Sequence, residues 1–170
     1  MLKIIRDIQP FIKDNYRRIN VREYARIQNI SAPTASKILS SLHKEGLLKK
    51  ENEKQYIYYY ADKESTLFID LSRIYWRLSL ERAGLVSFLE EELLNPVIIL
   101  FGSLSKAEAK QDSDIDLAVF STSKKEIPLE KYEKRLKRKI QFMLFQNRDD
   151  MKSTELLNSI LNGYIIAGSW

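Results

Sequence analysis

The chain has 170 residues, of which 44% are hydrophobic and 30% charged, which leaves room for one or two small folded domains. It contains no cysteine and a single histidine, His43, so disulfide frameworks and zinc sites built from Cys or His are excluded. No run of about 18 apolar residues is present. The first residues also carry charges where a signal peptide is apolar, so we expect a cytoplasmic protein without a membrane partner.

The positive charge is concentrated in the first third of the chain. Residues 1–62 carry twelve Lys and Arg against seven Asp and Glu, a net charge of +5, which equals the net charge of the whole chain. A local excess of this sign favours a polyanion as partner, although proteins that bind no nucleic acid also carry such charges.

The first part of the chain is predicted to form three helices. Apolar residues at helical spacing predict helices over 2–14 and 21–28. A third helix is predicted to begin after Ser31, which is a natural N-cap, and to run to about Lys44. Two short helices, a tight turn and a capped third helix form a helix-turn-helix pattern.

A β-hairpin is predicted to follow the third helix. Its strands are expected at 47–50 and 55–61, with the four residues between them as the turn. Tyr56, Tyr58 and Tyr60 alternate along the second strand, and we expect them to cover the inner face of the hairpin.

The order of these elements over residues 1–62 resembles that of winged-helix regulators, whose recognition helix and first wing strand are similar to residues 38–48. The resemblance implies double-stranded DNA as partner, approached by small hydroxyl and Lys side chains on the outward face of the third helix. The alternatives are a protein–protein contact or an ordinary solvated helix face. The expected DNA-binding residues are Thr34, Ser36, Lys37, Ser40 and Lys44.

Residues 63–95 are predicted to form a long helical connector that bends at Gly84. One apolar stripe follows spacings of four, three and four residues, and its members are Leu67, Leu71, Ile74 and Leu78. Tyr75, Trp76 and Leu80 lie outside this stripe. They predict either the seam of a homodimer or burial within the chain.

Residues 97–120 carry the pattern with the clearest chemical content. Residues 97–101 are continuously apolar and rich in β-branched side chains, which predicts a buried strand. Gly102 ends this strand and allows another group to approach the backbone closely. Ser103 adds a hydroxyl and a backbone N–H beside it, and such a turn can hold a phosphate when it leads into a helix.

Asp114 and Asp116 stand at the start of a second apolar run, on either side of Ile115. Residues i and i+2 of a strand point to the same face, so the two carboxylates are expected to project together. They repel one another unless a cation lies between them, and Mg²⁺ is the cation that suits oxygen ligands and substrate phosphates. A phosphate cradle facing a metal pair on the next strand is the minimum apparatus for phosphoryl or nucleotidyl transfer.

This stretch resembles the signature of the polymerase-β-like nucleotidyltransferase superfamily, and it is most similar to the minimal members from bacteria and archaea. The resemblance implies transfer of a nucleoside monophosphate from an NTP, expected to be ATP, to a hydroxyl of a protein, RNA or small molecule. It assigns catalysis and Mg²⁺ binding to Asp114 and Asp116, and nucleotide binding to these two with Gly102 and Ser103. The alternative is a pair of strands with two solvated Asp side chains. The matching residues are Phe101, Gly102, Ser103, Ser113, Asp114, Ile115, Asp116 and Leu117.

A third strand is predicted over 140–145 and a last helix over 154–162. Active members of the superfamily usually carry a third carboxylate on this strand, where the chain has Gln141. A neutral amide cannot serve as a general base near neutral pH. Asp149 and Asp150, just beyond the strand, are the alternative acids.

We therefore expect an α+β chain with a winged helix-turn-helix domain at 1–62, a helical connector at 63–95 and a minimal nucleotidyltransferase domain with a small mixed sheet at 96–170. Two functions remain open. The intact Gly-Ser and Asp-x-Asp motifs favour an enzyme. The helix-turn-helix pattern and Gln141 favour a catalytically impaired, nucleotide-sensing transcriptional regulator, or an antitoxin-type protein that binds a toxin.

Overall fold

The structure is a computed structural model that describes residues 2–123, 125–151 and 153–169, without the side chain of Arg148. It is a mixed α+β chain in two compact units. The N-terminal unit comprises Met1–Tyr75 and Ala107–Gln111, and the C-terminal unit comprises Trp76–Lys106 and Asp112–Trp170. In the described part of the chain, no helix is both long and apolar enough to cross a membrane.

The three helices predicted at the start of the chain are confirmed. They are α1 (Lys3–Lys13), α2 (Val21–Gln28) and α3 (Ala32–Lys44). The side chain of Ser31 caps α3 as expected, because its Oγ accepts the backbone N–H of Thr34 at 3.4 Å. Fully buried residues of α1, α2 and α3 pack together as the core of the N-terminal unit, among them Ile5, Ile8, Phe11, Ile12, Tyr24 and Leu39.

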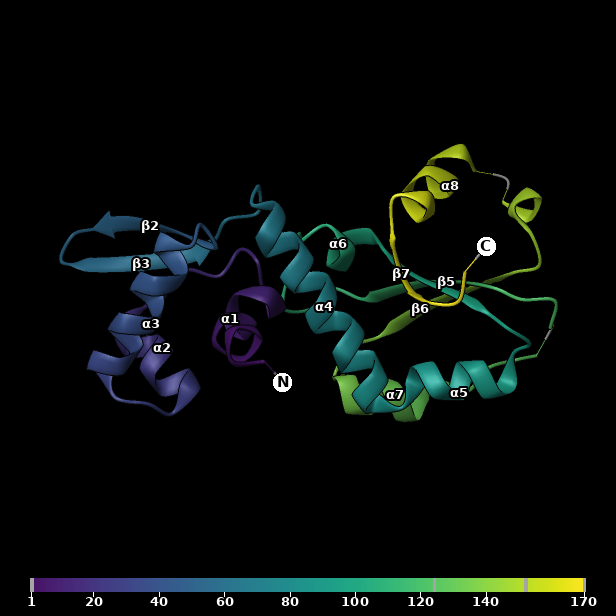
Figure 1. Cartoon of the computed structure of the whole chain (residues 1–170), viewed down its shortest axis with the longest axis horizontal. Coiled ribbons are helices and arrows are strands. Elements are labelled where there is room, and N and C mark those ends of the chain that lie inside the picture. The colour runs from purple at the N-terminus through teal and green to yellow at the C-terminus, as the bar shows by residue number, and fades with distance from the viewer. Residues whose placement is uncertain (1, 124, 152, 170) are drawn as a thin grey trace. The chain divides into compact units, whose positions relative to one another are not determined.

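A three-stranded antiparallel sheet completes this unit, in the order β1-β3-β2. Its strands are β1 (Ile19–Asn20), β2 (Leu48–Glu53) and β3 (Tyr56–Ala61). The predicted turn is too long, because β2 continues to Glu53 and only Lys54 and Gln55 connect the two strands. Figure 1 shows the resulting long hairpin.

The prediction that Tyr56, Tyr58 and Tyr60 cover the inner face of the hairpin is wrong. The buried residues of β3 are Tyr59 and Ala61, whereas Tyr56 is 40% exposed. Side chains alternate along a strand, so burying Tyr59 and Ala61 places the three even-numbered tyrosines on the opposite face, where Tyr58 and Tyr60 are half-buried.

The connector consists of α4 (Thr66–Ala83) and α5 (Leu85–Glu92), separated at Gly84, whose φ of +78° ends the first helix. The side chains of Tyr75, Trp76 and Leu80 are at most 4% exposed. Of the two predicted alternatives, they are therefore buried within the chain and do not form the seam of a homodimer. The exposed apolar residues of α4 belong to the other stripe, with Leu67 at 49% and Ile74 at 36%.

The C-terminal unit is built on a four-stranded sheet in the order β6-β5-β4-β7. β4 pairs antiparallel with β5 and with β7, and β5 pairs parallel with β6. The last strand was not predicted. The four strands are β4 (Val97–Phe101), β5 (Ile115–Phe120), β6 (Ile140–Phe145) and β7 (Tyr164–Ala167).

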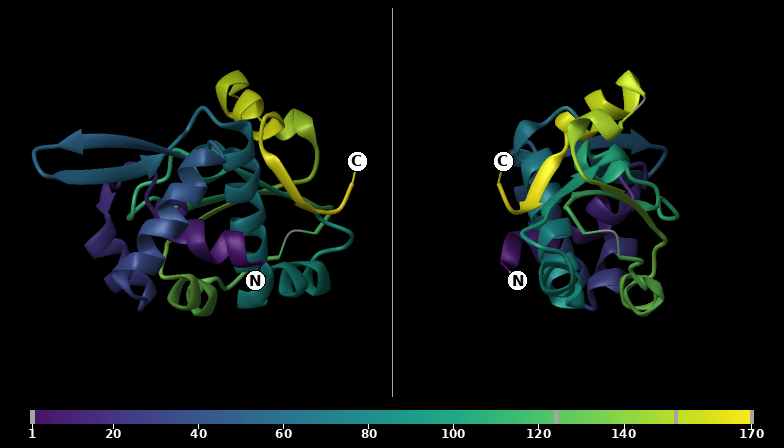
Figure 2. Two further views of the ribbon diagram at one scale, coloured as in Figure 1. Left: turned by 60° about the vertical axis from the view of Figure 1, so that its left-hand side comes forward. Right: turned by 90° about the vertical axis from the view of Figure 1, so that its right-hand side faces the viewer.

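Helices cover both faces of this sheet (Figures 1 and 2). α8 (Thr154–Leu161) lies on one face, and α5 with α7 (Glu130–Leu136) lies on the other. The remaining short helices are α6 (Gly102–Ser105) and the 3-10 turn Arg148–Asp150. The apolar cluster under α8 contains Val97, Ile99, Phe101, Ala118, Phe120 and Ile160.

Candidate functional site

The strand pairing brings the predicted motif residues together at one end of the sheet. Phe101, the last residue of β4, is opposite Asp116 of β5, and Asp116 is opposite Gln141 of β6. By strand alternation Asp116 points to the same face as Ala118 and Phe120. Asp116 and Gln141 therefore lie opposite each other on the face of the sheet that packs under α8, just past the end of its apolar residues.

Gly102 lies directly against the carboxylate of Asp116. A Cβ added at Gly102 would overlap Asp116 Oδ2, far inside van der Waals contact. The φ of Gly102 is +67°, a conformation that side chains with a Cβ rarely adopt. Both observations require glycine here, because the Asp116 carboxylate occupies the place that a Cβ would take.

The backbone after Gly102 turns immediately into α6. The Oγ of Ser105 donates to the carbonyl oxygen of Gly102 at 2.9 Å, which closes this turn. Leu104 and Ser105 are buried, whereas Ser103 is half-buried and stands beside Gly102. Of the two Ser residues in this turn, Ser103 is therefore the one with access to a ligand.

Asp114 is held from the neighbouring strand by Gln141, whose Nε2 donates to Asp114 Oδ2 at 3.1 Å. Arg138 belongs to a run of basic residues at 134–139, which indicates either a phosphate or nucleic-acid contact or a solvated face. In the structure its guanidinium donates to the carbonyl oxygen of Ser113, and it lies 4.9 Å from the centre of the Trp76 ring. Arg138 thus fixes the backbone just before Asp114, a structural role that the basic run does not indicate.

The surroundings of Asp116 disfavour the charged form of its carboxylate. Burial raises the pKa of Asp116 above the usual range of an Asp, and the negative charge of Asp114 raises it further. Ionising Asp116 therefore costs more than ionising an ordinary Asp, and a nearby cation would offset this cost. Among the described residues, no group of three or more His, Cys, Asp or Glu is placed to hold a metal ion. The pair supplies two oxygen ligands of the kind that a divalent cation takes, so a cation held here would need its other ligands from a bound phosphate and water.

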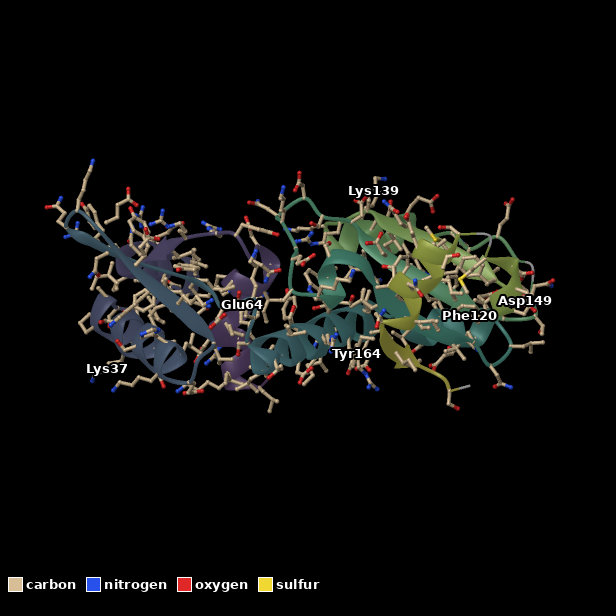
Figure 3. All side chains as sticks on the ribbon, turned by 90° about the horizontal axis from the view of Figure 1, so that it is seen from above. Lys37, Glu64, Phe120, Lys139, Asp149 and Tyr164 are labelled. Atoms are coloured by element: carbon tan, nitrogen blue, oxygen red, sulfur yellow. The ribbon has the colours of Figure 1, made fainter. Side chains whose placement is uncertain are left out.

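Asp149 and Asp150 lie too far away to complete this pair. β6 runs parallel to β5, so residues beyond Phe145 lie at the opposite end of the sheet from Asp116. Ile140 and Phe145, the two ends of β6, are five residues apart, which corresponds to about 16 Å along a strand. Figure 3 shows Asp149 well separated from Lys139, the residue just before β6. Asp150 is already used locally, because its Oδ2 accepts the backbone N–H of Gln146 at 2.8 Å.

The residues predicted to contact DNA lie together on α3, in the N-terminal unit. Thr34, Ser36, Lys37 and Lys44 are exposed and Ser40 is half-buried. Figure 3 shows Lys37 projecting from the helix. Thr34 shares a hydrogen bond with Ser31 at 2.8 Å between the hydroxyl oxygens. α3 therefore presents Lys and hydroxyl side chains, with the N-terminal hydroxyl already oriented by the cap.

The comparison with known families agrees with the geometry of the C-terminal unit. The family model described as polymerase beta, nucleotidyltransferase matches residues 85–167, a range that contains Gly102, Ser103, Asp114, Asp116 and Gln141. The match supports a nucleotidyltransferase domain in this part of the chain, and with it nucleotidyl transfer as the general class of reaction. No curated protein matches the chain.

Proposed function

We propose that the chain transfers a nucleoside monophosphate from an NTP, with ATP as the first candidate, to an acceptor hydroxyl, and that its N-terminal unit is a winged-helix domain that binds double-stranded DNA. The observation that carries the transferase proposal is the contact between Gly102 and Asp116. It places a glycine turn directly beside Asp116, one of the two carboxylates, within the segment that the nucleotidyltransferase family model matches.

Each residue has a defined task in this proposal. The backbone at Gly102 lets a phosphate approach without steric conflict, and Ser103 offers its N–H and hydroxyl to phosphate oxygens. Asp114 and Asp116 would hold Mg²⁺, and Gln141 keeps Asp114 oriented through the 3.1 Å hydrogen bond. When bound, Mg²⁺ supplies charge neutralisation and Lewis-acid polarisation at the phosphate. Gln141 itself cannot take a proton from the acceptor hydroxyl.

Label transfer tests the reaction. Full-length protein is incubated with each α-labelled NTP, Mg²⁺ and host lysate as a source of acceptors, and label is expected on an acceptor with ATP. Gly102→Ala is expected to lower transfer by about 10²-fold, because the added Cβ displaces the Asp116 carboxylate. Gly46→Ala is the matched control, since Gly46 also has a positive φ, +72°, but nothing within 4 Å of the added Cβ. Equal transfer by the two variants would contradict the site.

The DNA-binding proposal is supported by the exposed face of α3 and by the charge of residues 1–62. Lys37 and Lys44 project from the same helix as the hydroxyl groups of Thr34 and Ser36, a combination suited to phosphate contacts and base edges. The β2–β3 hairpin that follows α3 has the position of a wing.

DNA affinity is expected to fall steeply as the salt concentration rises, because phosphate contacts release bound counterions. Lys37→Ala with Lys44→Ala should weaken binding and reduce the slope of log affinity against log salt by about 2. The measurement is fluorescence anisotropy with labelled promoter-region DNA. Lys134→Ala with Lys137→Ala removes the same charge from the C-terminal unit and should leave the slope unchanged. The DNA-binding proposal fails if both double variants behave alike.

A second candidate function is favoured by Gln141. An amide where active relatives carry a carboxylate suits a protein that binds nucleotide and Mg²⁺ without turnover, as a nucleotide-sensing regulator or antitoxin-type partner of another protein would. Tight nucleotide binding with no label transfer to any acceptor would select this function.

A further inference from the structure

The two halves of the proposed nucleotide site are joined by a segment that belongs to the other unit. Lys106 and Asp112 are in the C-terminal unit, but Ala107–Gln111 between them pack with the N-terminal unit. The chain therefore leaves Ser103, passes through the N-terminal unit and returns to Asp114.

A single side chain of the N-terminal unit fixes the middle of this segment. Asn15 is 2% exposed, and its Oδ1 accepts the backbone N–H of Ala109 at 2.6 Å. Its own backbone N–H donates to the carbonyl oxygen of Ala109 at 2.8 Å, and its Nδ2 donates to the carbonyl oxygen of Phe11 at 2.8 Å. The amide offers its acceptor and its donor on separate atoms, so the Asn15 side chain ties Ala109 to α1.

The burial of two alanines and a contact of Lys110 also hold this segment in place. Ala107 and Ala109 are 0% exposed, and Ala107 has a φ of +56°, an unfavourable conformation that persists only when its surroundings hold it. The ammonium group of Lys110 lies 5.9 Å from the centre of the Tyr16 ring, next to Asn15 in the sequence. The segment is therefore held at several consecutive residues.

We infer that Asn15 is a positioning residue for the nucleotide site, an inference that rests on the proposed function of that site. By holding Ala109 it fixes the path of the segment whose ends carry Ser103 and Asp114. Without this contact the backbone N–H of Ala109 loses its partner and the segment populates other conformations. Apparent affinity for a nucleotide falls in proportion to the fraction of molecules in the binding-competent conformation, so we expect Asn15→Ala to weaken Mg²⁺–ATP binding about 10-fold.

Limited proteolysis tests the first step without any nucleotide. Lys106 and Lys110 are exposed trypsin sites on either side of Ala109. Well below the melting temperature, Asn15→Ala should be cleaved at these two bonds about 10-fold faster than the wild type, since cleavage tracks the open population. Leu39→Ala, a variant in the core of α3, matches the loss of stability and should show no selective increase at these bonds. Equal cleavage patterns in both variants would overturn the inference.

A redox rescue tests the second step. The chain has no cysteine, so Asn15→Cys with Ala109→Cys creates a single pair across backbones already joined by a 2.8 Å hydrogen bond. The oxidised protein should bind Mg²⁺–ATP with an affinity within about 2-fold of the wild type. The reduced protein should bind about 10-fold more weakly, because fewer molecules are in the binding-competent conformation. Equal affinity in both redox states overturns the positioning role. Failure of the wild type to bind any NTP would instead refute the proposed function, while proteolysis would still report whether Asn15 holds the segment.

Discussion

In the absence of a metal ion, Asp116→Asn is expected to raise the melting temperature at neutral pH. Burial and the charge of Asp114 raise the pKa of Asp116 in the folded state, so the folded state binds more protons than the unfolded state over the titration range. Stability is therefore lost as the pH rises through this range, and the ionised carboxylate destabilises the fold above it. The advantage of Asp116→Asn should vanish below the usual pKa range of an Asp, where both states of the wild type are protonated.

With Mg²⁺ and an NTP present, the wild type should instead have a higher melting temperature than Asp116→Asn. A ligand at 100 times its Kd stabilises the native state by about 2.7 kcal/mol, which corresponds to a rise of roughly 5–10 °C for a chain of this size. Asp114→Asn combined with Asp116→Asn should abolish the rise, because the cation loses both carboxylates. Differential scanning fluorimetry from pH 3 to 8, with and without Mg²⁺–ATP, measures both effects.

Asp112→Asn serves as the control for these measurements. Asp112 is exposed and lies two residues before Asp114, so its substitution removes the same charge without altering Asp114 or Asp116. It should leave the metal-free melting temperature and the ligand-induced rise unchanged. A double variant that keeps the full rise would rule out Asp114 and Asp116 as the metal-binding pair.

The part of the site that lies on regular strands could be predicted from the sequence. The apolar run at 97–101 indicates the strand that ends at Gly102, and the run after Asp116 indicates its neighbour. Strand alternation predicts that Asp114 and Asp116 project together, but β5 begins at Ile115, so Asp114 lies just before the strand. The contact between Gly102 and Asp116 follows once β4 and β5 pair antiparallel. Local patterns therefore determine this half of the site.

The role of Asn15 could not be predicted, because it depends on a hydrogen bond between residues 94 positions apart. A polar residue between two predicted helices indicates an exposed loop, and only the folded structure shows that Asn15 is buried. The strand β7 was missed for a similar reason. Its four residues follow a helix closely, and they form a strand only because β4 offers an unpaired edge.

The orientation of α4 shows how two periodic patterns compete. The stripe that contains Leu67 and Ile74 has ideal helical spacing, but the helix buries Phe68, Tyr75 and Trp76 instead. Aromatic side chains bury more apolar area than Leu or Ile, so the face that carries three of them gains more from contact with a core. Spacing identified the helix correctly, and side-chain size determined which face is buried.

Gln141→Glu is expected to change the chemistry of the site more than any other single substitution. The new carboxylate would take the place of the amide whose Nε2 is 3.1 Å from Asp114 Oδ2, so without metal it replaces a hydrogen bond with like-charge repulsion and lowers the melting temperature. With Mg²⁺ the three carboxylates share the cation, and the gain in stability on adding Mg²⁺ should exceed that of the wild type. A positioned general base also contributes about 10²–10⁴-fold to rate, so label transfer should rise within this range.

Gln146→Glu is the matched control, because Gln146 is exposed just beyond the far end of β6 and its substitution adds the same charge away from Asp114. It should alter neither the response to Mg²⁺ nor transfer. Robust transfer by the wild type that is lost in Gln141→Glu would contradict the assignment of this position to the missing carboxylate. Stronger Mg²⁺ binding by Gln141→Glu without transfer by either protein would favour the nucleotide-sensing function. In that case the base would have been supplied and the metal bound, which would leave the acceptor pocket as the part of the transferase that this chain lacks.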